Sequence, residues 1–345
     1  MNRPWYDFGV RHARLSLLFL LCFAATCKAQ TLDVYFIDVE GGQATLMVSP
    51  SGESLLVDAG WSDFEGRDAE RIAAAAKSAG LKKIDYLVVT HYHRDHVGGV
   101  PELAERIPIK TFVDHGPSVE TSQAAKDLFE AYRKVRGNGR HILAKPGDRI
   151  PVKGLDVEIL SAAGNVISTP LAGAGSPNPL CAEAQRGNDD PGENGQSIGM
   201  MIRYGKFRLL DLGDLSWNGE LDLACPNHRL GMVDVYLTTH HASEMSGPAA
   251  MVHALHPQVA VMNNGARKGG APDVWRVLRS SPGLEDIWQL HFSVEGGDGN
   301  NAPPQFIANV EEDCKGFGLN LSVDSDGSLT VTNARNGLSK TYPPR

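Results

Sequence analysis

Short apolar runs, each bounded by glycine, proline or serine, alternate with helical patterns along most of this chain. Runs rich in β-branched and aromatic side chains predict strands, and the continuous run 86–90 predicts a strand buried on both faces. The predicted strands are 33–39, 44–49, 54–58, 86–90, 110–113, 149–152, 155–160, 198–204, 207–212, 233–238, 259–262, 287–292, 319–323 and 328–332. An Ala-rich segment that Gly80 stops is typical of a helix. The predicted helices are 67–79, a segment from about Pro101, 121–135, 218–224 and 271–278.

Two strand-rich halves, each with its own helices, predict the α/β class. Because sheets bury their apolar faces in packed layers, we expect an αββα four-layer sandwich with helices outside two sheets. Between the halves, 163–196 is rich in Gly, Pro, Asn and Asp, which predicts a loop insertion, either functional or disordered. Asp326-Gly327 predicts a hairpin over about 319–333. No linker divides the halves, so residues 30–345 are expected to form one domain.

The first residues have the pattern of an export signal. Arg3, Arg11 and Arg14 precede an apolar run at 15–25, and small residues follow around Ala29. This pattern predicts a cleaved signal peptide over 1–29 and a secreted or periplasmic protein. The run is too short to span a bilayer of about 30 Å, and no other stretch is long enough. An uncleaved N-terminal anchor is the alternative.

The charge balance is acidic. The chain has 33 Lys+Arg against 41 Asp+Glu, a net charge of −8. Cleavage after residue 29 would remove four basic residues and one acidic residue, which leaves 29 against 40 and a charge of −11. Sequence-independent binding of long nucleic acid needs a basic surface, so we expect a small-molecule or short anionic substrate instead.

Three cysteines lie beyond the predicted signal peptide, in a compartment that permits disulfides. Cys181 and Cys225 lie in the two longest loop-like regions, which favours a bond between them and leaves Cys314 free. The alternative is three buried free thiols.

A cluster of potential metal ligands follows the buried strand 86–90. His91-x-His93-x-Asp95-His96 places four nitrogen or oxygen donors in six residues, which suits a divalent metal. Two further strand ends carry donors of the same kind. Asp214 comes after 207–212 and a glycine, where its carboxylate could bridge two cations. His240 and His241 follow 233–238. Three strand ends that present His and Asp together predict a metal site.

These residues resemble the metallo-β-lactamase fold superfamily, whose signature is His-x-His-x-Asp-His, then Gly-Asp and a distal His. Within it, the chain is most similar to the hydrolase domain of ComEC-type competence proteins. The similar segments are Asp38-Val39-Glu40-Gly41-Gly42-Gln43, Leu56-Val57-Asp58-Ala59-Gly60 and His240-His241-Ala242-Ser243. The likeness runs from about residue 32 to 292 and implies the metallo-β-lactamase fold, an αββα sandwich.

The resemblance also implies how the ligands are shared. We assign His91 and His93 to one metal and Asp95, His96 and His240 to a second, with Asp214 as the bridge. His241 is the alternative final ligand, and Asp95 is expected to be catalytic because it could steer the attacking water. We expect one or two Zn²⁺ ions, with Mn²⁺ as an alternative.

One ligand of the superfamily is missing. Many members carry a further His before the Gly-Asp, whereas this chain has Glu193-Asn194-Gly195-Gln196-Ser197 there. Asn194, as in ComEC-type domains, or His115 could take its place. A site with a single metal ion is the other alternative.

The implied activity is hydrolysis by a metal-bound hydroxide, which attacks an electrophilic phosphorus or carbonyl carbon. A phosphodiester or similar small anionic substrate is favoured, and Asn194, Arg267 and Lys268 are expected to contact it. Hydrolysis of a β-lactam or lactone is the alternative. Outside this class, the alternatives are a non-catalytic metal-binding protein and an iron-dependent redox enzyme, for which the chain supplies no flavin domain.

Overall fold

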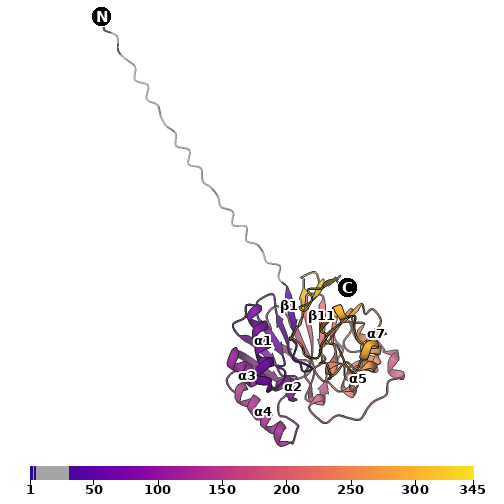
Figure 1. Ribbon diagram of the computed structural model, residues 1–345. Coiled ribbons are helices and arrows are strands. Elements are labelled where there is room, and N and C mark those ends of the chain that lie inside the picture. The colour runs from indigo at the N-terminus through magenta and orange to yellow at the C-terminus, as the bar shows by residue number, and fades with distance from the viewer. Residues whose placement is uncertain (3, 5–30) are drawn as a thin grey trace.

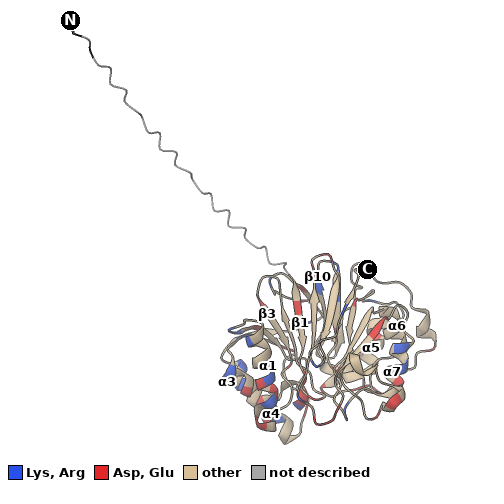
Figure 2. Ribbon diagram, turned by 45° about the horizontal axis from the view of Figure 1, so that its top comes forward, with Lys and Arg blue, Asp and Glu red and all other residues tan. Residues whose placement is uncertain are grey.

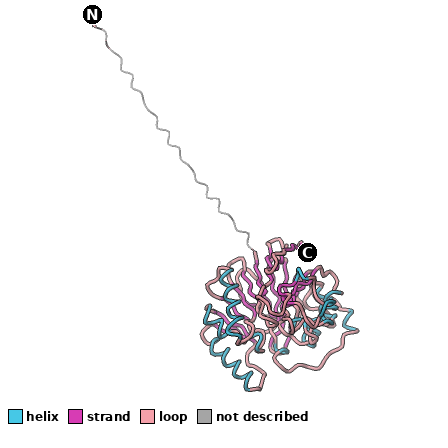
Figure 3. The backbone as a smooth tube through the Cα atoms, in the orientation of Figure 1, coloured by secondary structure: helices cyan, strands magenta, loops and turns pink. Residues whose placement is uncertain are grey.

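The computed structural model describes residues 1–2, 4 and 31–345, so the predicted signal peptide lies almost entirely outside the described residues. Two mixed sheets lie face to face, with helices on both outer sides (Figure 1). The tube in Figure 3 shows the same layers, with strands inside and helices outside. The expected αββα sandwich is therefore confirmed. Within the described part of the chain, no helix is long and apolar enough to cross a bilayer.

The first sheet has the order β18-β17-β16-β1-β2-β3-β4-β5-β6. Its strands are β1 (Leu32–Phe36), β2 (Thr45–Val48), β3 (Ser54–Val57), β4 (Ile84–Val88), β5 (Ile109–Asp114), β6 (Arg140–Leu143), β16 (Leu319–Val323), β17 (Leu329–Asn333) and β18 (Ser339–Tyr342). Strands β3 to β6 are parallel, whereas β16 and β17 form an antiparallel hairpin. Helices α1 (Arg67–Ser78), α3 (Val100–Arg106) and α4 (Gln123–Arg136) cover the outer face of this sheet.

The second sheet has the order β15-β14-β13-β12-β11-β10-β8-β7, with β9 (Asn165–Val166) paired to β8. Its strands are β7 (Arg149–Ile150), β8 (Asp156–Ala162), β10 (Gly199–Tyr204), β11 (Phe207–Asp211), β12 (Val235–Leu237), β13 (Val259–Met262), β14 (Asp286–His291) and β15 (Ile307–Asn309). The strands from β11 to β15 are parallel. Helices α5 (Trp217–Ala224), α6 (Ala249–Leu255) and α7 (Pro272–Arg279) cover its outer face.

The alternation of side chains along each strand fills three apolar layers. In β4, Val88 belongs to the core between the sheets, while its neighbour Leu87 belongs to the layer under α1 and α3. Trp288 of β14 and Tyr342 of β18 meet in the central layer, where the indole Nε1 donates to the Tyr342 hydroxyl at 2.9 Å. Charged side chains gather instead on the outer helices (Figure 2).

Some elements were not predicted from the sequence. Strands β6 and β18 have polar, largely exposed sequences at the two edges of the first sheet, so they lack the apolar run that predicts a strand. The predicted strand 233–238 is shorter in the structure, where β12 spans Val235–Leu237.

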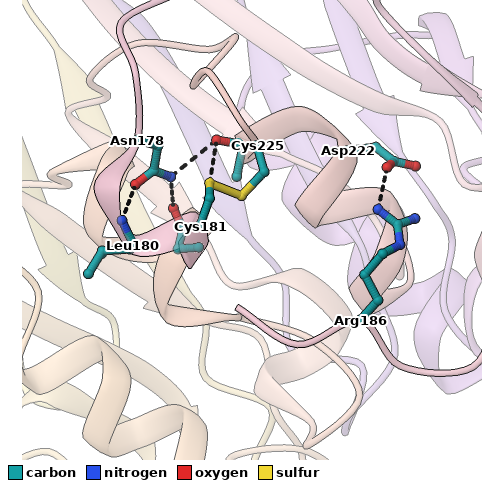
Figure 4. The surroundings of a disulfide bond; sticks show 8 residues. Asn178, Leu180, Cys181, Arg186, Asp222 and Cys225 are labelled. Atoms are coloured by element: carbon teal, nitrogen blue, oxygen red, sulfur yellow. Dashed lines mark hydrogen bonds and ion pairs between the residues drawn. A yellow bond between two sulfur atoms is a disulfide. The ribbon is translucent and has the colours of Figure 1, made fainter. Parts of the chain in front are cut away.

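Segment 163–196 is anchored to the second half of the chain. The predicted bond between Cys181 and Cys225 is present, and Arg186 pairs with Asp222 of α5 at 2.7 Å (Figure 4). The Asn178 amide donates to the carbonyl oxygens of Ala224 and Ala250. Cys314 is a free thiol, and burial, together with Asp38, raises its pKa to about 12.

Removing this disulfide tests how much the covalent anchor contributes. We expect the double variant Cys181→Ser/Cys225→Ser to lose about 4 kcal/mol of unfolding free energy, because the bond closes a loop with a sequence separation of 44. Urea denaturation of both proteins measures this loss. Cys314→Ser is the matched control and should change stability much less; equal stability of double variant and wild type would contradict the expectation.

Candidate metal centre

Three strand ends meet between the two sheets. β4 leads into α2 (Arg94–Val97), β11 leads to Asp214, and β12 leads to His240 and His241. Gly213 allows the close approach of the sheets: its φ is 55°, and a Cβ there would lie 2.9 Å from the Thr90 Cβ. The Ile198 amide also donates to the Thr90 carbonyl oxygen at 2.9 Å.

Four buried side chains form the central cluster: Asp95, His96, Asp214 and His241. Each offers one ligand atom, and these atoms all lie within 4.8 Å of one another. His96 Nε2 lies 3.2 Å from His241 Nε2, 3.2 Å from Asp214 Oδ2 and 3.3 Å from Asp95 Oδ2. His241 Nε2 lies 3.3 Å from the other Asp214 oxygen, Oδ1. The donor set is two imidazoles and two carboxylates, a potential metal-binding site.

Three further histidines lie next to the central cluster: His240 and His91 are near Asp214, and His93 is near His91. His240 Nε2 lies 3.4 Å from Asp214 Oδ2, and His91 Nε2 lies 3.9 Å from the same oxygen. His91 Nε2 also lies 2.9 Å from His93 Nδ1. The His93 side chain is 38% exposed, whereas His91 is fully buried, so His93 marks the open side of the site. All the histidines expected at the site therefore lie at or beside the central cluster.

Hydrogen bonds from outside the cluster orient three of the rings. Asp58 Oδ2 accepts from His96 Nδ1 at 2.7 Å, and the Asn263 carbonyl oxygen accepts from His241 Nδ1 at 3.2 Å. His91 Nδ1 donates to Thr90 Oγ1 at 3.1 Å, because that hydroxyl already donates its own proton to Asp58. With a metal ion bound, Nδ1 of each ring would keep its proton and Nε2 would turn its lone pair toward the cluster, as in metal-ligating histidines.

The charges in the cluster compensate one another. Burial opposes ionisation of Asp214, but His241, His96 and His240 hold the pKa of its carboxyl well below the ordinary value. Asp95 behaves in the same way: burial is outweighed by His96 and His241, and its pKa is also well lowered. Burial disfavours protonated His96, yet Asp214, Asp95 and Asp58 raise its pKa well above the ordinary value. A divalent cation would supply the positive charge that the carboxylates demand.

An unsatisfied polar atom also fits a metal ion. Asp214 Oδ1, within the central cluster, is buried and lacks a hydrogen-bond partner among the described residues. A buried carboxylate oxygen of this kind is uncommon in folded proteins and is available to bind a cation. The donors present therefore fit a divalent metal.

The structure distinguishes between the expected alternatives. The central cluster contains His241, the alternative ligand, whereas His240 approaches Asp214 without reaching Asp95 or His96 within the cluster. This favours His241 over His240 beside Asp95 and His96. The two residues differ because each has a left-handed backbone, with φ of 51° and 55°, which turns successive side chains in directions that strand alternation does not predict.

The residues proposed to replace the missing histidine also differ. His115 Nε2 pairs with Glu193 Oε2 at 3.0 Å, and that oxygen also accepts from the Tyr92 amide, so His115 is already engaged. Asn194 is buried and its Oδ1 has no partner among the described residues. Asn194 therefore stays the candidate to take the place of the missing histidine.

The two basic residues of the 263–270 loop, Arg267 and Lys268, contact different parts of the protein. Lys268 Nζ pairs with Asp95 Oδ2 and lies 5.2 Å above the Trp61 ring, so it is at the site. Arg267 makes a two-pronged ion pair with Glu312, at 2.8 and 2.9 Å, and its side chain is 72% exposed. The Arg267 guanidinium thus has a surface partner, and its expected contact with the substrate stays a prediction.

The turn that carries His240 and His241 is strained and firmly held. Left-handed backbone costs roughly 1–2 kcal/mol per residue outside glycine. The His240 amide donates to the Gly213 carbonyl oxygen, and the Gly270 amide donates to that of His241, both at 2.9 Å. A Cβ at Gly269 would lie 2.1 Å from the His241 oxygen, so only glycine allows this contact.

A buried carboxyl that no sequence pattern predicted supports the same turn. Glu220 of α5 accepts from the Gly247 amide at 2.7 Å and from the Tyr236 hydroxyl at 3.4 Å. The Tyr236 hydroxyl in turn accepts from the Thr239 amide at 3.1 Å, directly before His240. Complete burial raises the pKa of Glu220 to about 7. Asp58, Thr90 and Asn263 were likewise missed as supports, although Asp58 lay in a segment similar to ComEC-type domains.

Part of the chain matches a known protein family. Residues 37–181 match the family described as the metallo-beta-lactamase superfamily. The chain thus carries a metallo-beta-lactamase superfamily domain, as the resemblance implied.

Individual relatives refine this likeness. The chain is 24% identical to ComE operon protein 3 of Bacillus subtilis over 271 residues, which cover 72% of this chain and 30% of that protein. It is 32% identical to hydroxyacylglutathione hydrolase of Stenotrophomonas maltophilia over 104 residues, 30% of this chain and 37% of the relative. The chain spans about a third of the length of these two relatives. The metallo-beta-lactamase fold protein YhfI of Bacillus subtilis superposes with a TM-score of 0.46 and 12% identity, over 75% of this chain and 96% of that one.

The stability of the protein should depend on pH through Glu220. The raised pKa means that the folded state keeps a proton which the unfolded state releases above about pH 4.5. The contribution of Glu220 to stability is therefore fully present below pH 4.5 and is lost as the pH rises through 7, by roughly 3 kcal/mol. Glu220→Gln has no such proton, so we expect its stability relative to wild type to improve steadily from pH 5 to pH 8. Urea denaturation across this range measures the difference; a difference that does not change with pH would contradict it.

Proposed function

We propose that this protein is a metal-dependent hydrolase that acts on a phosphodiester or similar small anionic substrate outside the cytoplasm. The observation that carries the proposal is the central cluster, in which Nε2 atoms of His96 and His241 converge on two carboxylates while Asp58 and Asn263 hold their Nδ1 atoms. The Cys181–Cys225 bond supports an oxidising compartment, and so supports the predicted signal peptide.

The geometry supports a particular division of ligands. Asp95, His96 and His241 would hold one ion, His91 and His93 would hold a second, and Asp214 lies between the two groups. Zn²⁺ is the first candidate because it favours imidazole and carboxylate ligands, and Mn²⁺ is the alternative. When bound, a divalent ion would lower the pKa of water toward neutrality and polarise an oxygen of the substrate.

The protein's own side chains would then orient the reactants. Asp95 is ionised at neutral pH, because His96 and His241 lower its pKa, so its carboxylate can accept a hydrogen bond from the attacking water. Lys268, at the edge of the cluster, is placed to bind an anionic oxygen of the substrate. The buried Asn194 amide could contact the same group. The exposed edge of His93 leaves an open side for the substrate.

Two substrate classes are supported to different degrees. The similarity to ComE operon protein 3 over most of this chain and the cationic Lys268 favour a phosphodiester. The similarity to a protein named hydroxyacylglutathione hydrolase favours an acyl compound, such as a lactone or β-lactam, as the second candidate.

Metal removal and ligand substitution test the activity. We expect the zinc-loaded protein to hydrolyse bis(p-nitrophenyl) phosphate. Chelation of the zinc should abolish this activity, because the proposed mechanism activates the attacking water through the bound metal ion. His93→Ala and Asp214→Asn should each lower kcat/KM about 100-fold or more. His141→Ala, an exposed histidine on β6, is the matched control.

The same assay run with a lactone and with nitrocefin separates the substrate classes. Hydrolysis of the lactone or nitrocefin, but not of the phosphodiester, would favour an acyl compound as the substrate. A metal-loaded wild type that hydrolyses none of the three would refute the hydrolase proposal in favour of a binding protein.

Asp58 gives a second test, through metal affinity. The two carboxylate oxygens of Asp58 accept hydrogen bonds from His96 Nδ1, the Thr90 amide and the Thr90 hydroxyl. In Asp58→Asn, only one oxygen remains to accept these three hydrogen bonds. An NH₂ group facing His96 would force the proton onto Nε2, which then cannot bind a metal. We expect zinc affinity to fall 10- to 100-fold by calorimetry. Asp85→Asn, the same change in a buried acid near the start of β4, is the control; equal losses in both variants would argue for a general folding defect instead.

A further inference from the structure

A cavity of about 610 Å³ is lined by two segments that follow candidate metal ligands in the sequence, and by part of the long loop. Its walls are the 185–191 part of the long loop, Ser216 and Trp217, and Glu244 and Met245. Two of these walls continue directly from the candidate ligands: Ser216 and Trp217 follow Asp214, and Glu244 and Met245 follow His241. A cavity of this size would hold one arm of a small substrate whose reactive group lies at the cluster.

The cavity is rigidly built. The Trp217 indole Nε1 donates to the Gln185 carbonyl oxygen at 2.9 Å, which fixes the ring as a wall. The Asn218 side chain exchanges two hydrogen bonds with the backbone of Gly187. The Arg186–Asp222 ion pair and the Cys181–Cys225 bond tie the same loop to α5 (Figure 4). Because the wall is preformed, binding of a ligand does not carry the entropy cost of ordering the loop.

The chemistry of the walls is aromatic and negative. Trp217 and Met245 supply apolar surface, and Met245 is 51% exposed. Asp189, Asp190 and Glu244 supply three carboxylates. Among the described residues that line the cavity, the positive charge comes from Arg186, which is already paired with Asp222. A second anionic group of a substrate would be repelled here, whereas an ammonium group would meet both an aromatic face and carboxylates.

We propose that this cavity binds an ammonium-bearing arm of the substrate, so that the substrate is a small zwitterionic diester with its anionic group at the central cluster. This inference rests on the proposed function and narrows it.

Binding of two isosteric probes tests the cavity without relying on turnover. Phosphocholine carries a trimethylammonium group, and 3,3-dimethylbutyl phosphate has the same shape without the charge. By calorimetry on the zinc-loaded wild type, we expect phosphocholine to bind about 10-fold more tightly. Glu244→Gln and Trp217→Ala should each bring this ratio toward one. Glu105→Gln, on α3 and far from the cavity, is the matched control and should keep the ratio.

Turnover separates failure of this inference from failure of the hydrolase proposal. Wild-type hydrolysis of the p-nitrophenyl phosphodiester of choline should exceed that of its dimethylbutyl counterpart by a similar factor. Equal binding of the two probes, or tighter binding of the uncharged one, would overturn the subsite even if both diesters were hydrolysed. Preferential phosphocholine binding without any hydrolysis would keep the subsite and overturn the hydrolase.

Discussion

Three buried carboxylates, those of Asp58, Asp95 and Asp214, impose the constraint on which this site depends. An isolated buried charge is costly, so each carboxylate needs a positive or proton-donating partner. His96 provides it for all three, with distances of 2.7 Å to Asp58, 3.3 Å to Asp95 and 3.2 Å to Asp214. Asp58 and Asp95 belong to the half with the first sheet and Asp214 to the half with the second, so His96 can meet them only where the two sheets come together. A divalent cation satisfies the same demand with more charge.

The surrounding backbone holds the strand ends in place around His96. Gly213 lets the second sheet approach Thr90, and Thr90 in turn bonds to Asp58 and His91. On the far side, the left-handed turn at His240 and His241 is held from α5 by Glu220 through Tyr236. The strain of that turn is sustained because neighbouring segments fix it from several directions, as is common at functional sites. The long loop, fastened by its disulfide, then closes one wall of the cavity that Trp217 also lines.

The sequence predicted those features that depend on short-range patterns. Apolar runs defined most strands of both sheets, and the spacing from His91 to His96 defined a ligand cluster without reference to the rest of the chain. The choice between His240 and His241 could not be predicted, because it depends on backbone angles that Gly213, Gly269 and Gly270 impose from distant segments. The ion pair of Arg267 could not be predicted for a similar reason: its partner Glu312 lies 45 residues away in the sequence. Polar edge strands such as β6 carry no apolar pattern at all.

The most direct test of the metal centre is anomalous X-ray diffraction at the zinc edge, from crystals of the wild type grown with zinc. We expect an anomalous peak at the central cluster, with His96 Nε2 and His241 Nε2 about 2.0–2.1 Å from the ion and an oxygen of Asp214 at about 2.0–2.2 Å. A peak confined to surface residues, with Lys268 still paired to Asp95 and no anomalous density within the central cluster, would contradict the proposed metal centre.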